Sequence, residues 1–199
     1  MTRPVCLLLC FGFLSLASAP LAAEGVKPSQ SQATPQAQES VPVLDRLFQQ
    51  LRAAASPQQA KQIAERIERR WLRSGSDTVD LLSKRAAMAY EAGDQALAVE
   101  LLDRMIALKP DWAEAYYQRA VVLVMLEDER RAASDFGETL RLEPRHYKAM
   151  LALGAIMQKQ ERKKAAFALY DHVLTLYPFN ETAQHLADHL RADVKGRDL

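Results

Sequence analysis

Downstream of about residue 41, the hydrophobic residues recur at intervals of three and four positions. This spacing places them along one face of an α-helix, whereas a half-buried strand would alternate apolar and polar residues at every second position. No stretch sustains such an alternation, and the segment is poor in glycine and proline but rich in alanine, leucine, arginine and glutamate. Because these residues favour helix, the pattern predicts an all-α domain over residues 41–199.

Two apolar stripes predict a helix pair over residues 41–75. The first stripe contains Val43, Leu44, Leu47, Phe48 and Leu51, and the second contains Ala60, Ile63, Ala64, Ile67 and Trp71. Ser56 followed by Pro57 is the start signal of the second helix, because serine caps a helix N-terminus and proline fits its first position. Gly75 is the expected stop signal.

Three prolines indicate an internal repeat. Pro110, Pro144 and Pro178 are separated by 144 − 110 = 34 and 178 − 144 = 34 residues. A fixed period of this length indicates stacked copies of one structural unit. We place the repeats at residues 79–112, 113–146 and 147–180. We expect a last helix at residues 181–195, capped by Asn180, to cover the open end of the array.

The aligned repeats carry small residues where two helices would touch and large residues beside them. The small columns are Ala86, Ala120 and Gly154, and Ala98, Ala132 and Ala166; the large column is Leu102, Phe136 and Tyr170. Small side chains allow close helix approach, and the large ones fill the adjoining space. Proline ends each pair because it lacks an N–H and disfavours helix in the residue before it. His146, two residues after Pro144, is therefore expected in a turn.

This pattern resembles the tetratricopeptide repeat (TPR) family, which has small residues at repeat positions 8 and 20, an aromatic residue at 24 and proline at 32. The sequence departs from the family's pattern at three other positions. Arg85 and Arg119 replace leucine at position 7, Ala89 replaces tyrosine at position 11, and Met105, Thr139 and Val173 replace alanine at position 27. The resemblance implies a right-handed α-solenoid of antiparallel helix pairs, with residues 41–75 as a degenerate additional pair. The stretch 71–82 also looks like the entry to the repeats in small exported bacterial proteins of this family.

The helices that open the repeats carry a second apolar stripe. It contains Tyr90 in the first repeat, Tyr117, Val121 and Val124 in the second, and Leu151 and Ala155 in the third. One partner helix cannot bury both stripes of such a helix. The resemblance implies that the second stripe lines a concave groove for a partner's peptide or helix. The alternative is that neighbouring helices or the last helix cover it. On the groove interpretation, replacing Tyr117 weakens binding and leaves stability nearly intact.

Some members of this family hold a terminal carboxylate with lysine, asparagine and arginine side chains. The corresponding positions here are Ser83, Ala87, Gln118 and Lys148, and only Lys148 matches. The resemblance therefore implies no complete carboxylate clamp. Lys148 is added to the predicted groove residues.

The first 23 residues have the pattern of a secretory signal, because Arg3 precedes an apolar stretch that ends in the small residues Ala22 and Ala23. The alternative is an uncleaved membrane anchor, since the apolar stretch approaches the ~20 residues that span a bilayer. Residues 24–40, rich in glutamine, serine and proline, predict a disordered tether. We expect an exported protein, periplasmic or secreted. An alanine- and arginine-rich chain with Asn180 as its single asparagine indicates a bacterial source.

Composition and the absence of catalytic motifs argue against several classes of function. Cys6 and Cys10 both lie within the predicted signal, so the mature chain would have neither a disulfide nor a catalytic thiol. Without Arg3, the 26 basic residues become 25 against 25 acidic ones, and a neutral chain argues against nucleic acid as the partner. The sequence contains no GxSxG, HExxH or phosphate-binding glycine motif.

His185 and His189 are the candidate metal ligands, because histidines four residues apart share one helix face, and His172 is expected nearby. A closed metal site needs about four ligands, which weakens this candidate. The sequence favours a non-catalytic scaffold for a protein partner, without a cofactor. Two alternatives stay open: a metal-binding or enzymatic protein that uses these histidines, and a self-associating structural subunit.

Overall fold

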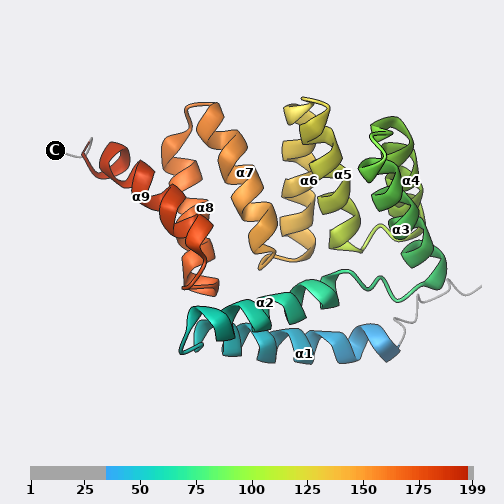
Figure 1. Ribbon diagram of the computed structural model, residues 1–199, viewed down its shortest axis with the longest axis horizontal. Coiled ribbons are helices and arrows are strands. Elements are labelled where there is room, and N and C mark those ends of the chain that lie inside the picture. The colour runs from blue at the N-terminus through green and yellow to red at the C-terminus, as the bar shows by residue number, and fades with distance from the viewer. Residues whose placement is uncertain (1–34, 197–199) are drawn as a thin grey trace, which may run out of the picture. The chain divides into compact units, whose positions relative to one another are not determined.

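The computed structural model describes residues 35–196, except for the side chains of residues 35–42 and 195. These residues belong to one compact unit, and every regular element among them is an α-helix (Figure 1). The helices are α1 (Pro35–Arg52), α2 (Pro57–Trp71), α3 (Asp77–Glu91), α4 (Gln95–Leu108), α5 (Ala113–Met125), α6 (Glu129–Leu142), α7 (Tyr147–Lys159), α8 (Lys163–Leu176) and α9 (Glu181–Lys195). The predicted all-α class is confirmed. Within this part of the chain, no helix combines the length and apolarity that crossing a bilayer requires.

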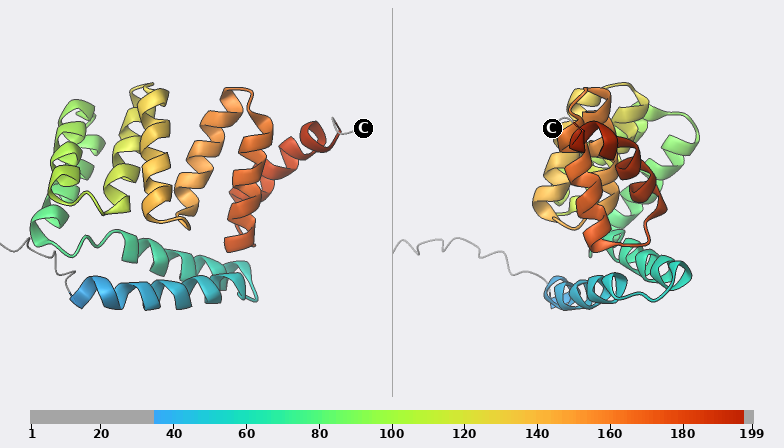
Figure 2. Two further views of the ribbon diagram at one scale, coloured as in Figure 1. Left: turned by 180° about the vertical axis from the view of Figure 1, so that it is seen from behind. Right: turned by 90° about the vertical axis from the view of Figure 1, so that its left-hand side faces the viewer.

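Helices α3 to α8 form antiparallel pairs, α3/α4, α5/α6 and α7/α8, that stand side by side (Figures 1 and 2). The turn inside each pair has the same backbone geometry. Gly93, Glu127 and Glu161 occupy equivalent repeat positions, and their φ angles are 79°, 59° and 60°. A left-handed residue of this kind ends a helix and redirects the chain. Glycine adopts it freely, whereas the two glutamates do so at a cost of about 1–2 kcal/mol each.

The predicted small and large columns form the core of each pair. Ala98, Ala132 and Ala166 have no exposed surface, and Leu102, Phe136 and Tyr170 are at most 1% exposed. Gly154 shows how residue sizes are matched, because a Cβ at this position would lie only 2.5 Å from Cε1 of Tyr170. The largest residue of the large column thus faces the smallest residue of its partner column. Packing density explains the glycine where the other repeats have alanine.

The N-terminal pair α1/α2 does not stack on α3 as a preceding repeat would. It runs crosswise along the ends of the other helices, on the side where α4 joins α5 and α6 joins α7 (Figure 1). Its apolar stripes pack against α7, α8 and the start of α9. The cluster includes Leu47, Phe48, Leu51, Ile63, Ile67, Trp71, Tyr147, Met150, Val173, Leu176 and Ala183. This docking places α2 beside the repeats' opening helices.

Helix α1 begins at Pro35, inside the segment predicted to be a tether. Residues 35–40 of that segment are therefore helical, and the domain starts earlier than residue 41. The predicted signal at residues 1–23 and the first part of the tether lie outside the described residues.

The last helix, α9, packs against α8, as the sequence predicts for residues 181–195. Ala187 and Leu190 form a buried cluster with Ala166 and Tyr170 of α8. The Asn180 side chain accepts a hydrogen bond of 2.9 Å from the backbone N–H of residue 183, which caps the first turn. The end of the array next to α8 is thus covered by the chain itself.

Candidate protein-binding groove

The second apolar stripe occupies three columns of equivalent positions on α3, α5 and α7. The columns are Ser83, Tyr117 and Leu151; Ala87, Val121 and Ala155; and Tyr90, Val124 and Gln158. The first column lies near the N-terminal ends of these helices and the third near their C-terminal ends. The N-terminal ends of α5 and α7 are the ends that face α2 (Figure 1). The environment of a stripe residue therefore depends on its column.

Tyr117, in the first column, is held by the protein's own packing. Its ring centroid lies 5.9 Å from that of Phe136 and 4.7 Å from that of His146. The Lys148 ammonium lies 5.8 Å from the centre of the same ring, within the range of a cation–π contact. Burial, followed by the negative charge of nearby carboxylates, raises the pKa of Tyr117 to about 12. The expectation that Tyr117 is dispensable for stability stays a prediction, and the packing of its ring between α5, α6 and α7 argues against it.

Lys148 is engaged by α2. Its Nζ lies 3.4 Å from Oε2 of Glu68, and Oε1 of the same carboxylate accepts a hydrogen bond of 2.8 Å from the Tyr147 hydroxyl. Burial, and then the charge of Glu68 and this hydrogen bond, raise the pKa of Tyr147. The one residue that matches the family's carboxylate clamp thus already has an internal carboxylate partner.

Trp71, the last residue of α2, fixes α2 to the repeat junctions. Its carbonyl oxygen accepts a hydrogen bond of 2.9 Å from Nε1 of Trp112, and its ring stacks on His146 with 4.1 Å between centroids. Nδ1 of His146 accepts a hydrogen bond from the Ala149 N–H, so its Nε2 carries the proton and lies 3.2 Å from Oε2 of Glu114. His146 lies at the end of the predicted turn, where its backbone N–H donates a hydrogen bond to the Glu143 carbonyl oxygen, and its completely buried side chain is the N-cap of α7.

Leu151 completes this region, because it packs partly buried against both the α1/α2 cluster and the α8/α9 cluster. We name Tyr117, Lys148 and Leu151 the covered half of the groove. We name the remaining predicted residues, Tyr90, Val121, Val124 and Ala155, the open half.

The open half presents apolar atoms to solvent. Val124 is 40% exposed, Ala155 is exposed, and Tyr90 and Val121 are partly buried against the cores of their own repeats. Tyr90 and Val121 pack against clusters of repeat residues, and neither cluster includes a described residue of α1 or α2. Their role in binding stays a prediction, and the structure leaves this half available for it.

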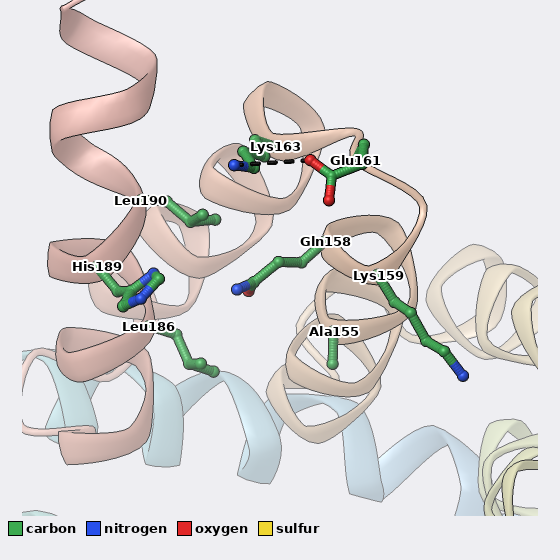
Figure 3. Close-up of a pocket in the computed structure, with 8 residues that line it drawn as sticks. All are labelled: Ala155, Gln158, Lys159, Glu161, Lys163, Leu186, His189 and Leu190. Carbon is green, nitrogen blue, oxygen red and sulfur yellow. Dashed lines mark ion pairs between the residues drawn. The ribbon is translucent and has the colours of Figure 1, made fainter.

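A cleft of about 490 Å³ continues the open half between α7 and α9 (Figure 3). It is lined by Ala155, Gln158, Lys159, Glu161, Lys163, Leu186, His189 and Leu190. Its apolar side chains, Ala155, Leu186 and Leu190, come from both helices, and the Gln158 amide points into the space between them (Figure 3). Lys163 pairs with Asp193 at 2.8 Å and with Glu161 at 3.6 Å, so its charge is balanced. The cleft can accept a side chain that has an apolar body.

Sequence reasoning missed two exposed apolar residues beside Val124. Met125 is 59% exposed and Leu126 is 48% exposed, at the end of α5. The signal was available, because Val121 to Leu126 is an uninterrupted apolar run that extends beyond the period of an amphipathic helix. The α9 side of the cleft had no such signal, since it depends on where α9 docks.

The candidate metal ligands do not converge. His172, His185 and His189 are all exposed, and only His189 lines the cleft. Across residues 35–196, no group of three or more His, Cys, Asp or Glu side chains is arranged to hold a metal ion.

Comparison with known proteins identifies the repeat. No family model matches the chain. A TPR repeat-containing protein of Rhizobium etli is 35% identical over 153 residues, which cover 77% of this chain and 75% of that protein. The chain belongs to the tetratricopeptide repeat family.

Solved TPR structures share the fold. The Arabidopsis OM64 TPR domain has a TM-score of 0.54 and 26% identity, and the match covers 58% of this chain and 95% of that one. The second TPR domain of human RPAP3, in complex with the HSP70 peptide SGPTIEEVD, has a TM-score of 0.52 and 20% identity, over 57% of this chain and 98% of that one. These likenesses confirm the helical-repeat solenoid. The two matches cover 58% and 57% of this chain, which is therefore longer than either TPR domain.

The TPR positions for a carboxylate clamp are occupied by different chemistry here. Ser83 Oγ donates a hydrogen bond of 3.2 Å to Oε1 of Gln118, and Nε2 of Gln118 lies 3.2 Å from Oε1 of Glu114. Together with the pairing of Lys148 to Glu68, these bonds leave no cluster of free cations at the clamp positions. The positions equivalent to the clamp therefore offer no set of unpaired cations to a terminal carboxylate.

Proposed function

We propose that this TPR protein is a non-catalytic adaptor, exported to the bacterial periplasm, that holds a helix or peptide of a partner protein in the open half of its groove. The observation that carries the proposal is the row of exposed apolar side chains at the end of α5, where Val124, Met125 and Leu126 are 40%, 59% and 48% exposed. Contiguous apolar surface of this kind is typical of interaction sites, because burying it against a partner releases ordered water.

The chemistry of the surface indicates an amphipathic ligand. Val121, Val124 and Ala155 offer aliphatic contacts, and the cleft beside Ala155 adds the apolar side chains of Leu186 and Leu190. A helix that presents apolar residues at intervals of three and four positions fits such a row. The peptide complex of the human RPAP3 TPR domain supports a peptide or helix as the class of ligand. The positions of the carboxylate clamp support recognition of side chains rather than of a chain terminus.

Export is the part of the proposal that rests on residues 1–23. Their charged start, apolar stretch and small-residue end support a cleaved secretory signal. The intact mass of protein purified from its native host tests this directly. We expect a mass that lacks the first 23 residues; a full-length species in the membrane fraction would instead indicate an anchor.

Binding is tested by photo-crosslinking in the native host. A photoreactive amino acid replaces Val124 in one variant and Leu97 of α4 in the control, because these residues are similarly exposed at 40% and 42% but only Val124 belongs to the groove. We expect a specific adduct from position 124, identified by mass spectrometry, that decreases when Val121→Ser is added. An adduct of the same protein from position 97 at equal yield would place the partner elsewhere and contradict the proposal.

A further inference from the structure

In the second and third repeats, the opening helix buries its outer face against the preceding pair. On α5, Ala115 and Val122 are 0% and 4% exposed, and on α7 the equivalent residues Ala149 and Ile156 are 0% and 6% exposed. Val122 belongs to a cluster with residues of α3 and α4, and Ala149 and Ile156 belong to a cluster with residues of α5 and α6. These repeat positions therefore form the contact between neighbouring repeats.

On α3 the same two positions are apolar but uncovered. They are Leu81 and Met88, and they are 52% and 68% exposed. No repeat precedes α3, because α1 and α2 pack against α7, α8 and α9 instead. The array is thus covered by α9 at one end, whereas at the other end it presents a face whose equivalents are buried in every other repeat.

Charged residues flank Leu81 in a symmetrical way. Asp77 lies four residues before Leu81 and Arg85 four residues after it, so all three share one face of α3. Arg119, the equivalent of Arg85 on α5, donates two hydrogen bonds of 2.7 Å to Asp135 of its own helix pair and also pairs with Asp103 of the preceding pair at 2.8 Å. Arg85 is exposed and has no ion pair with any described residue. Its repeat position therefore calls for an acidic partner across the end face.

We propose that this face of α3 binds a second copy of the chain, with the two α3 helices antiparallel around a twofold axis at Leu81. Antiparallel pairing places Asp77 of each copy opposite Arg85 of the other and Leu81 against Leu81. The face formed by Asp77, Leu81 and Arg85 is complementary to itself only when the two helices are antiparallel, because parallel helices would place like charges side by side. Met88 of each copy then extends over the residues before the other α3, where Leu72 is 50% exposed. An isologous contact of this kind closes at two copies.

The dimer does not involve the groove. Tyr90, the groove residue of α3, lies nine residues from Leu81, which is two and a half helical turns and hence the opposite face. The dimer and the groove can therefore be tested, and can fail, independently.

The test measures the mass of the purified protein by sedimentation over a range of concentrations. We expect the wild type to double in mass as its concentration rises. Asp77→Arg and Arg85→Asp should each be monomeric under conditions where the wild type is dimeric, because each variant opposes like charges. The double variant Asp77→Arg/Arg85→Asp should recover the twofold mass. An equimolar mixture of the two single variants should also recover it, as a heterodimer.

Circular dichroism of each variant shows that it is folded, and Asp188→Arg on α9, a residue whose side chain is 62% exposed, is the matched charge control that should remain dimeric. A wild type that stays monomeric at every concentration would overturn the proposal and leave the face to another protein's helix. A dimer that survives both single substitutions, or one that neither the double variant nor the mixture restores, would place the contact elsewhere.

Discussion

The covered half of the groove lies on α5 and α7, and the open half lies on α3, α5 and α7, yet the side chains of the two halves have different surroundings. In the covered half, Tyr117 packs on Phe136 and His146, and Lys148 pairs with Glu68. In the open half, Val124 is 40% exposed. Part of the difference comes from α2, because its Glu68 pairs with Lys148 and its Trp71 stacks on His146, the ring against which Tyr117 packs. A repeat position determines which helix face a residue occupies, but what covers that face depends on the rest of the chain.

The largest expected effect concerns the residue that holds α2 in place. Trp71→Ala should lower the free energy of unfolding by about 3–5 kcal/mol, because it removes a buried indole and its stacking on His146. Urea unfolding followed by circular dichroism measures the loss. Leu72→Ala is the control: this neighbouring side chain is 50% exposed, so its change should stay within about 0.5 kcal/mol. Equal effects of the two substitutions would show that Trp71 does not anchor α2.

Tyr117→Ala should cost about 2–3 kcal/mol, since it removes a mostly buried ring from the core next to Phe136. Tyr117→Phe should be nearly neutral, because the hydroxyl makes no hydrogen bond to a described residue. Thermal and urea unfolding of the two variants distinguish the possibilities. A Tyr117→Ala protein as stable as the wild type would show that the Tyr117 ring does not contribute to the core and belongs with the residues of the open half.

Glu68→Ala should cost about 1–2 kcal/mol, because it leaves the Tyr147 hydroxyl without its acceptor and Lys148 without its counter-charge. Glu68→Gln should cost less, since its amide oxygen can still accept the Tyr147 bond. Glu65→Ala on the same helix is the control, because Glu65 has only a surface contact of 3.9 Å with Arg69. In urea unfolding, we expect Glu68→Ala to lower the free energy of unfolding more than Glu68→Gln or Glu65→Ala does. A larger loss for Glu65→Ala than for Glu68→Ala would contradict this prediction.

Alkaline pH should destabilise the fold in part through Tyr117 of the covered half. The pKa of Tyr117 is raised to about 12 in the folded protein, whereas an unfolded tyrosine has a pKa of about 10. The resulting stabilisation is complete below pH 10 and is lost as the pH rises toward 12. At pH 11 this group alone should account for a loss of about 1 kcal/mol relative to pH 8. Unfolding free energies of wild type and Tyr117→Phe at both pH values test this, and identical losses would argue against it.

The smallest expected effect on stability belongs to the open half. Val124→Ser should change the unfolding free energy by less than about 0.5 kcal/mol, because the side chain is already substantially exposed. It should nevertheless weaken partner binding roughly fivefold or more, as truncation of an interface contact does. Titration calorimetry with the captured partner measures the affinity. Unchanged affinity would remove Val124 from the binding surface.

Much of the fold could be predicted from the sequence because each repeat is defined by contacts between residues that are close in the chain. The 34-residue spacing of the prolines and the small and large columns correspond to contacts within one helix pair. The glycine in the small column also has a local explanation, because Tyr170 leaves no room for a Cβ at Gly154. Contacts that recur at fixed separations leave a periodic signal in the chain.

The contacts that cover Tyr117, Lys148 and Leu151 could not be predicted from the sequence, because these contacts do not recur from repeat to repeat. Glu68 meets Lys148 at a separation of 80 residues, and Trp71 meets His146 across a similar distance in the chain. No other repeat contains such a pair, so no periodicity reveals it. His146 illustrates the point: its position after Pro144 indicates a turn correctly, but its burial depends on an indole supplied by α2.

The docking of α2 over the covered half is tested most directly by zero-length carbodiimide crosslinking of the free protein. The reagent joins an ammonium to a carboxylate only when they are in contact, and mass spectrometry identifies the joined peptides. We expect a link between Lys148 and Glu68, whose charged atoms are 3.4 Å apart, alongside the internal control link between Lys163 and Asp193 at 2.8 Å. Formation of the control link without any link between Lys148 and Glu68 would show that α2 does not dock over Lys148 in solution.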